Sequence, residues 1–380
     1  MTPTATPFVA GLEGVVAAQT HLSSVDGQAG ELIIAGFLVE ELAGRATAEE
    51  AIYLLWYDAL PTASQLAEFQ QNLAARRSLP PATLSLLQAA AAQRAPVMDA
   101  LRMAAGTLSL DATAGDAYDE AMTLVARFPT IVASYWRFLQ GLEPIEPRAE
   151  LSHAANYLYM LFGESPSDER RRGLETYLNT VIDHGLNAST FTARVIISTQ
   201  SDLVSAIVGA IGALKGPLHG GAPGPALDMV FEIGEAGRAE SVLRGMIERG
   251  DRLMGFGHRV YKVRDPRADV LGAAARRLYH ADGDMALYDL ASYVEQVAIR
   301  LLAEYKPGRN LQTNVEFYTA LLLHGLGLVT DLFTPTFAVG RVAGWIAHCF
   351  EQQRLNRLIR PQSAYVGPRG RQWIPLADRR

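Results

Sequence analysis

The 380-residue sequence predicts an all-α protein. Apolar residues recur at helical spacing along almost the whole chain, whereas alternating strand patterns are nearly absent. Apolar residues make up 49% of the chain and charged residues 19%, proportions typical of a globular protein with a large core. Runs that are apolar all round, such as 203–214, indicate helices that are buried on every side.

Capping signals and periodicity predict the elements in order. A Thr-x-x-Glu capping box at Thr47 opens a helix over 48–60, and a Thr-x-x-Gln box at Thr62 opens the next helix. The one alternating stretch, 31–34, predicts a short hairpin. The remaining predicted helices cover 83–92, 96–106, 116–125, 129–140, 149–163, 168–183, 188–199, 202–213, 222–234, 238–249, 266–279, 284–304, 314–325 and 336–355.

Loops rich in proline and glycine punctuate the second half of the chain. They predict a smaller domain over residues 220–330, inserted between two parts of a larger domain, 1–219 and 331–380. An inserted domain of this kind would leave a cleft at its hinges, and the candidate reactive residues coincide with these loops.

Charge and cysteine content exclude several classes of function. The net charge of −6 disfavours binding to nucleic acid or to an anionic membrane surface. The most apolar segment, 317–350, is interrupted by charged residues and proline, which favours buried helices over a membrane span. The single Cys349 excludes an intrachain disulfide and is typical of a reducing compartment. The N-terminus lacks a secretion signal, so we expect a cytoplasmic protein.

Three short segments of the C-terminal half carry groups that can move protons. His219 precedes two glycines, His258 follows Gly-Phe-Gly, and Glu316 follows Asn-Val. Two imidazoles and one carboxylate are sufficient to remove a proton from carbon and to join the resulting carbanion to a carbonyl. The glycines beside the histidines would let a ligand approach the backbone closely.

Simpler interpretations of these residues remain open. A histidine at a helix start, such as His219, often only satisfies backbone groups. The Gly-x-Gly at 255–257 lacks the third glycine and the preceding strand of a dinucleotide-binding loop, so we reject that function. No two histidines have the spacing of a zinc-binding helix, and no metal site is expected. His184, before a predicted helix, and Arg267, in the loop after His258, are candidates for the same cleft.

Several motifs, in order along nearly the whole chain, resemble the citrate synthase family. The matching segments are 11–20, 53–56, 60–62, 187–191, 216–220, 255–262, 333–341 and 359–361. The resemblance implies an all-α homodimer whose large and small helical domains close over the substrates, with the active site in the cleft between them. It also implies acetyl-CoA as a co-substrate and no permanently bound cofactor.

The resemblance further assigns roles at matching positions. Glu316 would remove a methyl proton from acetyl-CoA, His219 would hydrogen-bond the thioester oxygen, and His258 would polarise the ketone of oxaloacetate. Binding of the oxaloacetate carboxylates is implied for His184, Arg267 and Arg341, with Arg360 supplied by the partner subunit, and packing near the acetyl group for Phe337. CoA binding is implied for Leu253, Gly255, Gly257, Lys262 and Arg309.

At one catalytic position the chain departs from the family, which usually has Asp where Glu316 stands. The extra methylene moves the carboxylate by ~1.5 Å. Retracted backbone or another rotamer would absorb this shift. The preceding Gln312-Thr313 replaces a frequent Tyr-Pro, and we hypothesise that the two changes are linked.

Citrate formation from acetyl-CoA and oxaloacetate is the leading functional hypothesis. A close alternative is 2-methylcitrate formation from propionyl-CoA, because one methylene in an apolar pocket discriminates by only ~1–3 kcal/mol. A third hypothesis is a catalytically weak or inactive paralogue that binds CoA or a di-acid. A purely structural helical scaffold would leave the glycine–histidine loops unexplained.

Overall fold

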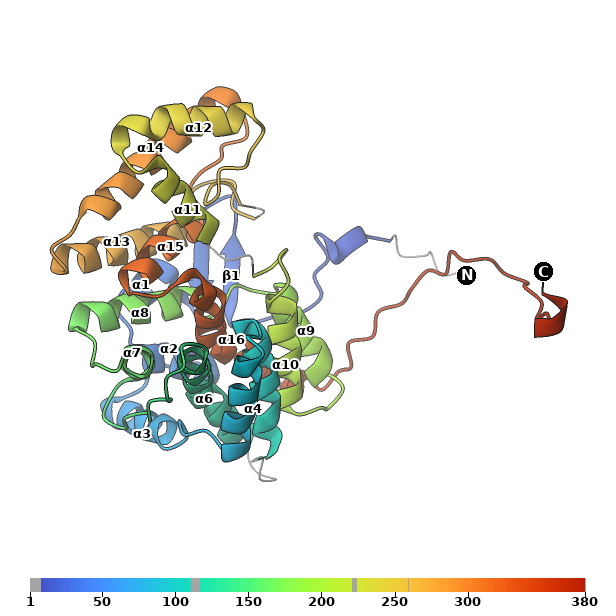
Figure 1. Cartoon of the computed structure of the whole chain (residues 1–380). Coiled ribbons are helices and arrows are strands. Elements are labelled where there is room, and N and C mark those ends of the chain that lie inside the picture. Colours follow the sequence, from blue (N-terminus) through green and yellow to red (C-terminus); the bar gives the residue numbers. More distant parts are fainter. Residues whose placement is uncertain (1–7, 111–116, 221–223, 259, 380) are drawn as a thin grey trace.

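The computed structural model describes residues 8–110, 117–220, 224–258 and 260–379. Helices account for most of the described chain, and one small sheet lies among them (Figure 1). The predicted all-α class is therefore confirmed. Short 3₁₀ turns also occur, at Ala10–Leu12, Leu108–Leu110, Ala236–Arg238, Thr330–Leu332 and Leu376–Asp378.

The larger group of helices is built from the first half of the chain together with α16. Its members are α1 (Val39–Leu42), α2 (Ala48–Tyr57), α3 (Ala63–Ala74), α4 (Pro81–Ala92), α5 (Val97–Thr107), α6 (Ala117–Leu139), α7 (His153–Phe162), α8 (Asp168–Val181), α9 (Ala188–Ile197), α10 (Leu203–Leu214) and α16 (Phe333–Leu355). Both predicted capping boxes are present: Thr47 and Thr62 each accept a hydrogen bond from the backbone N–H three residues later.

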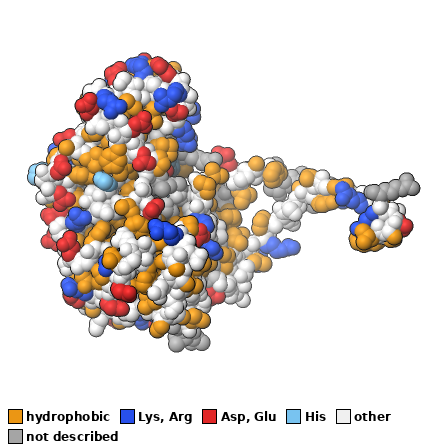
Figure 2. Space-filling view, viewed as in Figure 1, with side chains coloured by type: hydrophobic (Ala, Val, Ile, Leu, Met, Phe, Trp, Pro, Cys, Tyr) orange, Lys and Arg blue, Asp and Glu red, His pale blue; other side chains and the backbone are white. Residues whose placement is uncertain are grey.

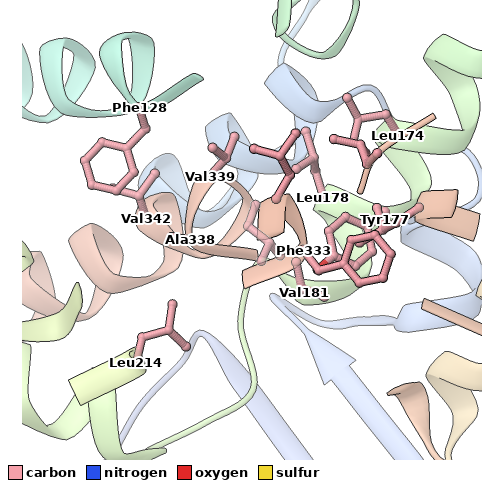
Figure 3. Close-up of a cluster of buried hydrophobic side chains, with 14 of the residues drawn as sticks. Phe128, Leu174, Tyr177, Leu178, Val181, Leu214, Phe333, Ala338, Val339 and Val342 are labelled. Atoms are coloured by element: carbon pink, nitrogen blue, oxygen red, sulfur yellow. The ribbon is translucent and has the colours of Figure 1, made fainter. Parts of the chain in front are cut away.

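Helix α16 lies in the middle of this group. It packs against α6, α8, α9 and α10, and most of its residues are buried. Figure 3 shows the core at this junction, where Phe128 of α6 lies beside Val342 of α16 and Leu178 of α8 belongs to the same cluster of buried side chains. Burial of these apolar side chains stabilises the fold and gives the functional site a rigid wall.

A smaller group of helices follows in sequence. It comprises α11 (Gly224–Ile233), α12 (Ala239–Glu248), α13 (Pro266–Ala281), α14 (Ala286–Tyr305) and α15 (Val315–Gly325). Figure 1 shows α11, α12 and α14 together at one end of the molecule. Helix α13 packs on both α15 and α8, so it joins the smaller group to the larger one. Residues 222 and 223 of the predicted helix 222–234 lie outside the described residues.

One helix prediction is wrong. The segments 116–125 and 129–140 were expected to be separate helices, but α6 is continuous and contains Pro129. A proline in a helix interior removes one hydrogen bond, here to the carbonyl of Val125, and strains the preceding turn. The residues around it, including Phe128 and Pro129, are buried, so tertiary packing offsets that local cost. Residue 116 lies outside the described residues.

The predicted hairpin is confirmed as part of a three-stranded antiparallel sheet with the order β1-β2-β3. Its strands are β1 (Ser23–Asp26), β2 (Glu31–Ile34) and β3 (Phe37–Leu38). Ser23 pairs with Ile34, which also pairs with Phe37. The β1–β2 turn contacts a site loop, because Lys262 N–H donates to the carbonyl of Gly27 at 2.8 Å.

After α16 the chain runs as an extended segment, 356–379, away from the helices (Figure 1). Among the described residues, no single helix has the length and apolarity to cross a membrane. Helix α15 and the segment Thr330–Leu355 reach that length and apolarity only when taken together, and the pair is bent by 116°. Most residues of that pair are buried within the fold.

Candidate active site

Seven of the predicted site residues line one cavity of about 270 Å³. The cavity lies between α8, α15 and α16 and the loops that carry the histidines. The predicted residues that it brings together are His184, His219, His258, Arg267, Glu316, Phe337 and Arg341. Residues separated by more than 150 positions in sequence thus surround one space.

His258 follows a loop in which Gly255 and Gly257 both have positive φ, at 86° and 78°. Its Nδ1 accepts hydrogen bonds from the backbone N–H groups of Val260 at 3.1 Å and Tyr261 at 3.2 Å. These bonds assign the ring proton to Nε2. Burial, assisted by Arg267, lowers the pKa of His258 to about 4, so the imidazole is neutral at pH 7.

His219 has the complementary arrangement. Its Nε2 accepts from the backbone N–H of Ser189 at 3.3 Å and lies 2.7 Å from Ser189 Oγ. The backbone bond assigns the ring proton to Nδ1. Burial, assisted by Arg341, lowers the pKa of His219 to about 4. The cavity is therefore lined by two neutral imidazoles, each with one N–H to donate.

Glu316 lies in the first turn of α15. The helix is capped by Asn314, whose Oδ1 accepts from the backbone N–H of Glu316 at 2.9 Å. Burial raises the pKa of Glu316, although Arg252 and Arg267 oppose that shift. A carboxylate that holds its proton more strongly than usual is a better base near neutral pH.

Two buried arginines face this cavity. Arg267 Nε and Nη2 donate to the two oxygens of Asp265 at 3.0 and 2.8 Å. Burial alone would lower the pKa of Arg267, but Asp265 outweighs it and the net shift is upward. Arg341 donates to the carbonyl of Val181, and burial lowers its pKa to about 10, so both guanidinium groups are charged at pH 7. Two fixed cations suit a ligand with two carboxylates.

His184 completes the polar wall. Its ring lies 6.2 Å from that of His258, and its Nε2 is 3.1 Å from the hydroxyl of Tyr261. Burial holds the pKa of His184 well below its ordinary value, and the neighbouring arginines act in the same direction. The loop that carries His184 is anchored by Ser23 of β1. The Ser23 hydroxyl accepts a hydrogen bond from Gly185 N–H at 2.8 Å and donates one to the Asp183 carboxylate at 2.5 Å.

A second groove, of about 580 Å³, adjoins the cavity and shares His258 with it. Four of the predicted CoA-binding residues line this groove: Leu253, Gly257, Lys262 and Arg309. Gly255 does not line it but supports its wall, since the Gly255 carbonyl accepts from Asn314 N–H at 2.9 Å.

The site contains residues that our sequence reasoning missed. Arg252 and Lys306 add two cations to the groove. Both are next to loops that the sequence had singled out, and this proximity could have identified them as members of the site. The cavity is also lined by Tyr177, Val181, Asn187, Val315, Thr319 and Phe333. Thr319 was detectable as the residue one helical turn after Glu316. The predicted Arg360 is exposed on the extended segment and does not line the cavity of its own chain.

Comparison with known proteins gives one consistent result. The chain matches the family described as "Citrate synthase, C-terminal domain" over residues 11–362. It is 41% identical to citrate synthase of Haloferax volcanii and 42% identical to citrate synthase 2 of Bacillus subtilis, with 97% of this chain and 98% of each relative covered. It is also 38% identical to 2-methylcitrate synthase of Shewanella oneidensis, with 97% and 98% covered.

Solved structures agree with this result. The structure of citrate synthase from Pyrobaculum aerophilum has a TM-score of 0.89 and 40% identity, covering 100% of this chain and 97% of that one. A ternary complex of citrate synthase from Thermoplasma acidophilum with carboxymethyl-CoA and oxaloacetate has a TM-score of 0.86 and 30% identity, with 97% and 98% covered.

The fold and the cavity define an all-helical enzyme with a large and a small helical part, equipped for proton transfer at carbon beside an anion-binding wall. The chain belongs to the citrate synthase family, whose enzymes form a carbon–carbon bond between acetyl-CoA and oxaloacetate.

Proposed function

We propose that this chain condenses acetyl-CoA with oxaloacetate and water to give citrate and CoA. The observation that carries the proposal is the grouping of a partly buried carboxylate, two neutral imidazoles and two buried arginines around one cavity. The chemistry fits, because a thioester α-proton is weakly acidic and its removal needs a base and an oxygen donor acting together.

The first step is enolisation of the thioester. Glu316 takes a proton from the methyl carbon of acetyl-CoA, and the N–H of His219 donates to the thioester oxygen as it gains negative charge. A neutral imidazole suits this role, since the pKa of His219, about 4, keeps the donor from carrying a charge that would vary near pH 7.

The second step is carbon–carbon bond formation. The carbon that lost its proton to Glu316 attacks the ketone carbon of oxaloacetate, and the electron pair of the C=O π bond moves to the ketone oxygen. The N–H of His258 hydrogen-bonds this alkoxide, which takes up one proton, equal in number to the proton removed by Glu316, and becomes a hydroxyl. Arg267 and Arg341, with His184, hold the two carboxylates and aim the ketone. Water then hydrolyses the citryl thioester and releases CoA.

The CoA moiety would occupy the adjoining groove. Lys262 and Arg309, with Arg252 and Lys306, supply cations for its phosphates, and the Leu253–Gly257 backbone offers polar groups to adenine. The cavity and the groove meet at His258, which would let the thioester reach the base.

The domain boundaries that we propose are 1–219 and 331–380 for the large domain and 220–330 for the small one. With these boundaries, His184 and Arg341 belong to the large domain, and His258 and Glu316 to the small one. Closure of the cleft would then assemble the base against the bound keto acid and exclude water.

A homodimer with shared active sites is also part of the proposal. Arg360 would reach the cavity of the partner subunit. Support comes from the extended segment 356–379, in which Val366 (96%), Trp373 (84%) and Leu376 (78%) are exposed. Figure 2 shows hydrophobic side chains along the segment that extends from the molecule, and such exposed apolar residues are suited to contact with another protein surface. The single cysteine favours a cytoplasmic location.

The test is to follow thiol release from acetyl-CoA and from propionyl-CoA in the presence of oxaloacetate. We expect release with acetyl-CoA at the higher kcat/KM. A higher kcat/KM with propionyl-CoA would identify a 2-methylcitrate synthase, as in the Shewanella relative. Measurable CoA binding without release from either thioester would support the inactive paralogue instead.

A further inference from the structure

Glu295, a buried carboxylate of α14, lies outside the cavity yet contacts the segment that carries Glu316. It is 6% exposed. Its Oε1 accepts from the hydroxyl of Thr313 at 2.6 Å, and its Oε2 accepts from the hydroxyl of Tyr318 at 2.5 Å. Glu295 is absent from the linings of both the cavity and the CoA groove, so no step of the proposed reaction uses it directly.

The two contacts bracket Glu316 in sequence. Thr313 is three residues before it and Tyr318 two residues after it, and both are buried, at 1% and 4% exposure. One contact therefore fixes the loop before α15 and the other fixes the first turns of the helix. Movement of either anchor would shift the Glu316 carboxylate relative to the cavity.

The network is complete enough to hold a buried charge. Arg264 Nη1 donates to Glu295 Oε1 at 2.7 Å, so three donors satisfy the two carboxylate oxygens. Burying a carboxylate is costly unless it is paired and hydrogen-bonded, as it is here. Burial and the Glu295 charge raise the pKa of Tyr318, which keeps its hydroxyl protonated as a donor.

The same segment is bonded to the loop before His258. Thr313 forms an antiparallel bridge with Phe256, and Gly257 N–H donates to the carbonyl of Gln312 at 2.7 Å. Asn314 Nδ2 also donates to the carbonyl of Gly257 at 2.8 Å. The base and the ketone-polarising imidazole thus sit on paired loops, and Glu295 ties this pair to α14.

We propose that Glu295 is a positioning residue that sets the location of the Glu316 carboxylate through the hydroxyls of Thr313 and Tyr318. The inference rests on the proposed role of Glu316 as the base. The threonine makes the contact possible, because a residue without a hydroxyl at 313 would leave Glu295 Oε1 with Arg264 alone. The network therefore holds the two ends of the segment from which the Glu316 side chain extends.

The experiment removes each hydroxyl with little change in shape. Thr313→Val and Tyr318→Phe are each expected to lower kcat on the order of 10-fold, because misplacement of a catalytic group by about 1 Å costs up to 10²-fold. KM for oxaloacetate is expected to change less than about 2-fold, since Arg267 and Arg341 are untouched. Thr313→Ser keeps the hydroxyl and is expected to restore kcat.

Thr130→Val is the matched control. Thr130 is a buried threonine of α6 whose hydroxyl has no hydrogen-bond partner among the described residues, so the same substitution there is expected to leave kcat unchanged. Thermal unfolding of every variant is measured in parallel. Full kcat in both Thr313→Val and Tyr318→Phe would overturn the proposal.

A second readout asks whether the network acts through Glu316. In a Glu316→Asp enzyme the carboxylate is already displaced, so adding Thr313→Val is expected to cost less than about 3-fold. An equal loss in both backgrounds would show that Thr313 acts through another group and would overturn the inference. That result would leave the proposed function intact, whereas undiminished turnover by Glu316→Gln would remove the base itself.

Discussion

At residue 316 the length of the side chain is the feature to test. Glu316→Asp withdraws the carboxylate by ~1.5 Å, while Arg267 and Arg341, which we propose hold oxaloacetate, stay in place. We therefore expect kcat to fall on the order of 10-fold and KM for oxaloacetate to stay within about 2-fold. Steady-state kinetics of thiol release measure both. An Asp enzyme as fast as the native one would mean that the backbone absorbs the shift.

The acidity of Glu316 predicts the pH dependence of the rate. Only its ionised form is a base, and burial raises its pKa above the ordinary 4.5. The acid limb of kcat/KM should therefore lie above pH 4.5, with the rate lost as pH falls through it. His219 and His258, with pKa values of about 4, stay neutral above that limb. A limb below pH 4.5 would contradict the assignment of Glu316, with its raised pKa, as the base.

The raised pKa of Glu316, which favours its action as a base, lowers the stability of the folded chain at neutral pH. A carboxyl whose pKa is higher in the folded than in the unfolded chain destabilises the fold above both values, and this cost disappears below the unfolded value. Glu316→Gln should therefore raise the melting temperature at pH 7, and the gain should shrink as pH falls toward 4.5. Thermal unfolding across this pH range checks the sign, and a constant or inverted difference would refute it.

Sequence reasoning reached seven members of the site through short motifs with reactive groups and through the resemblance to the citrate synthase family. His184, His219, His258, Arg267, Glu316, Phe337 and Arg341 all meet at the cavity. Residues that line it by virtue of three-dimensional packing, such as Tyr177 and Val181, carry no such signature in the sequence. Glu295 is the same case, since its partners Thr313 and Tyr318 are distant in sequence and only the fold brings them together.

At the scale of elements, the cap of α15 links stability to catalysis. Asn314→Ala removes the cap on the helix that carries Glu316 and the bond to the Gly257 carbonyl. We expect a loss of about 1 kcal/mol in the free energy of unfolding together with a fall in kcat of about 10-fold. Denaturant unfolding and kinetics measure the two effects.

Asp202→Ala is the control for that variant. Asp202 caps α10 through the N–H of Ser205 at 2.6 Å and lines neither the cavity nor the groove. The Asp202→Ala variant should lose about as much free energy of unfolding as Asn314→Ala and should keep the native kcat. If Asn314→Ala lost no more kcat than Asp202→Ala does, the cap would have no role in placing the base.

Element boundaries were predictable where the signal was local. The capping boxes at Thr47 and Thr62 placed the starts of α2 and α3. The continuity of α6 through Pro129 was not predictable, because the burial that offsets the lost hydrogen bond comes from other helices. Strand β3 was missed because it has only two residues, too few to show alternation.

At the scale of the whole molecule, the proposed homodimer with shared active sites predicts complementation between two defective subunits. In a dimer of one Arg360→Ala chain and one Glu316→Gln chain, one site keeps both Glu316 and the partner's arginine. Random pairing makes about half of the dimers mixed, each with one intact site of two, so co-expression should restore about one quarter of native activity. Activity no higher than the sum of the two defective homodimers would show that Arg360 does not act across subunits.

The role of Glu316 as the base is decided by the rate of thiol release from acetyl-CoA and oxaloacetate, compared between the native enzyme and Glu316→Gln. The two proteins differ by one ionisable group at one position. A positioned general base contributes 10²–10⁴-fold, so we predict turnover by the native enzyme and a loss on the order of 10³-fold in the Gln variant. Comparable rates in the two proteins would contradict the assignment of Glu316 as the base.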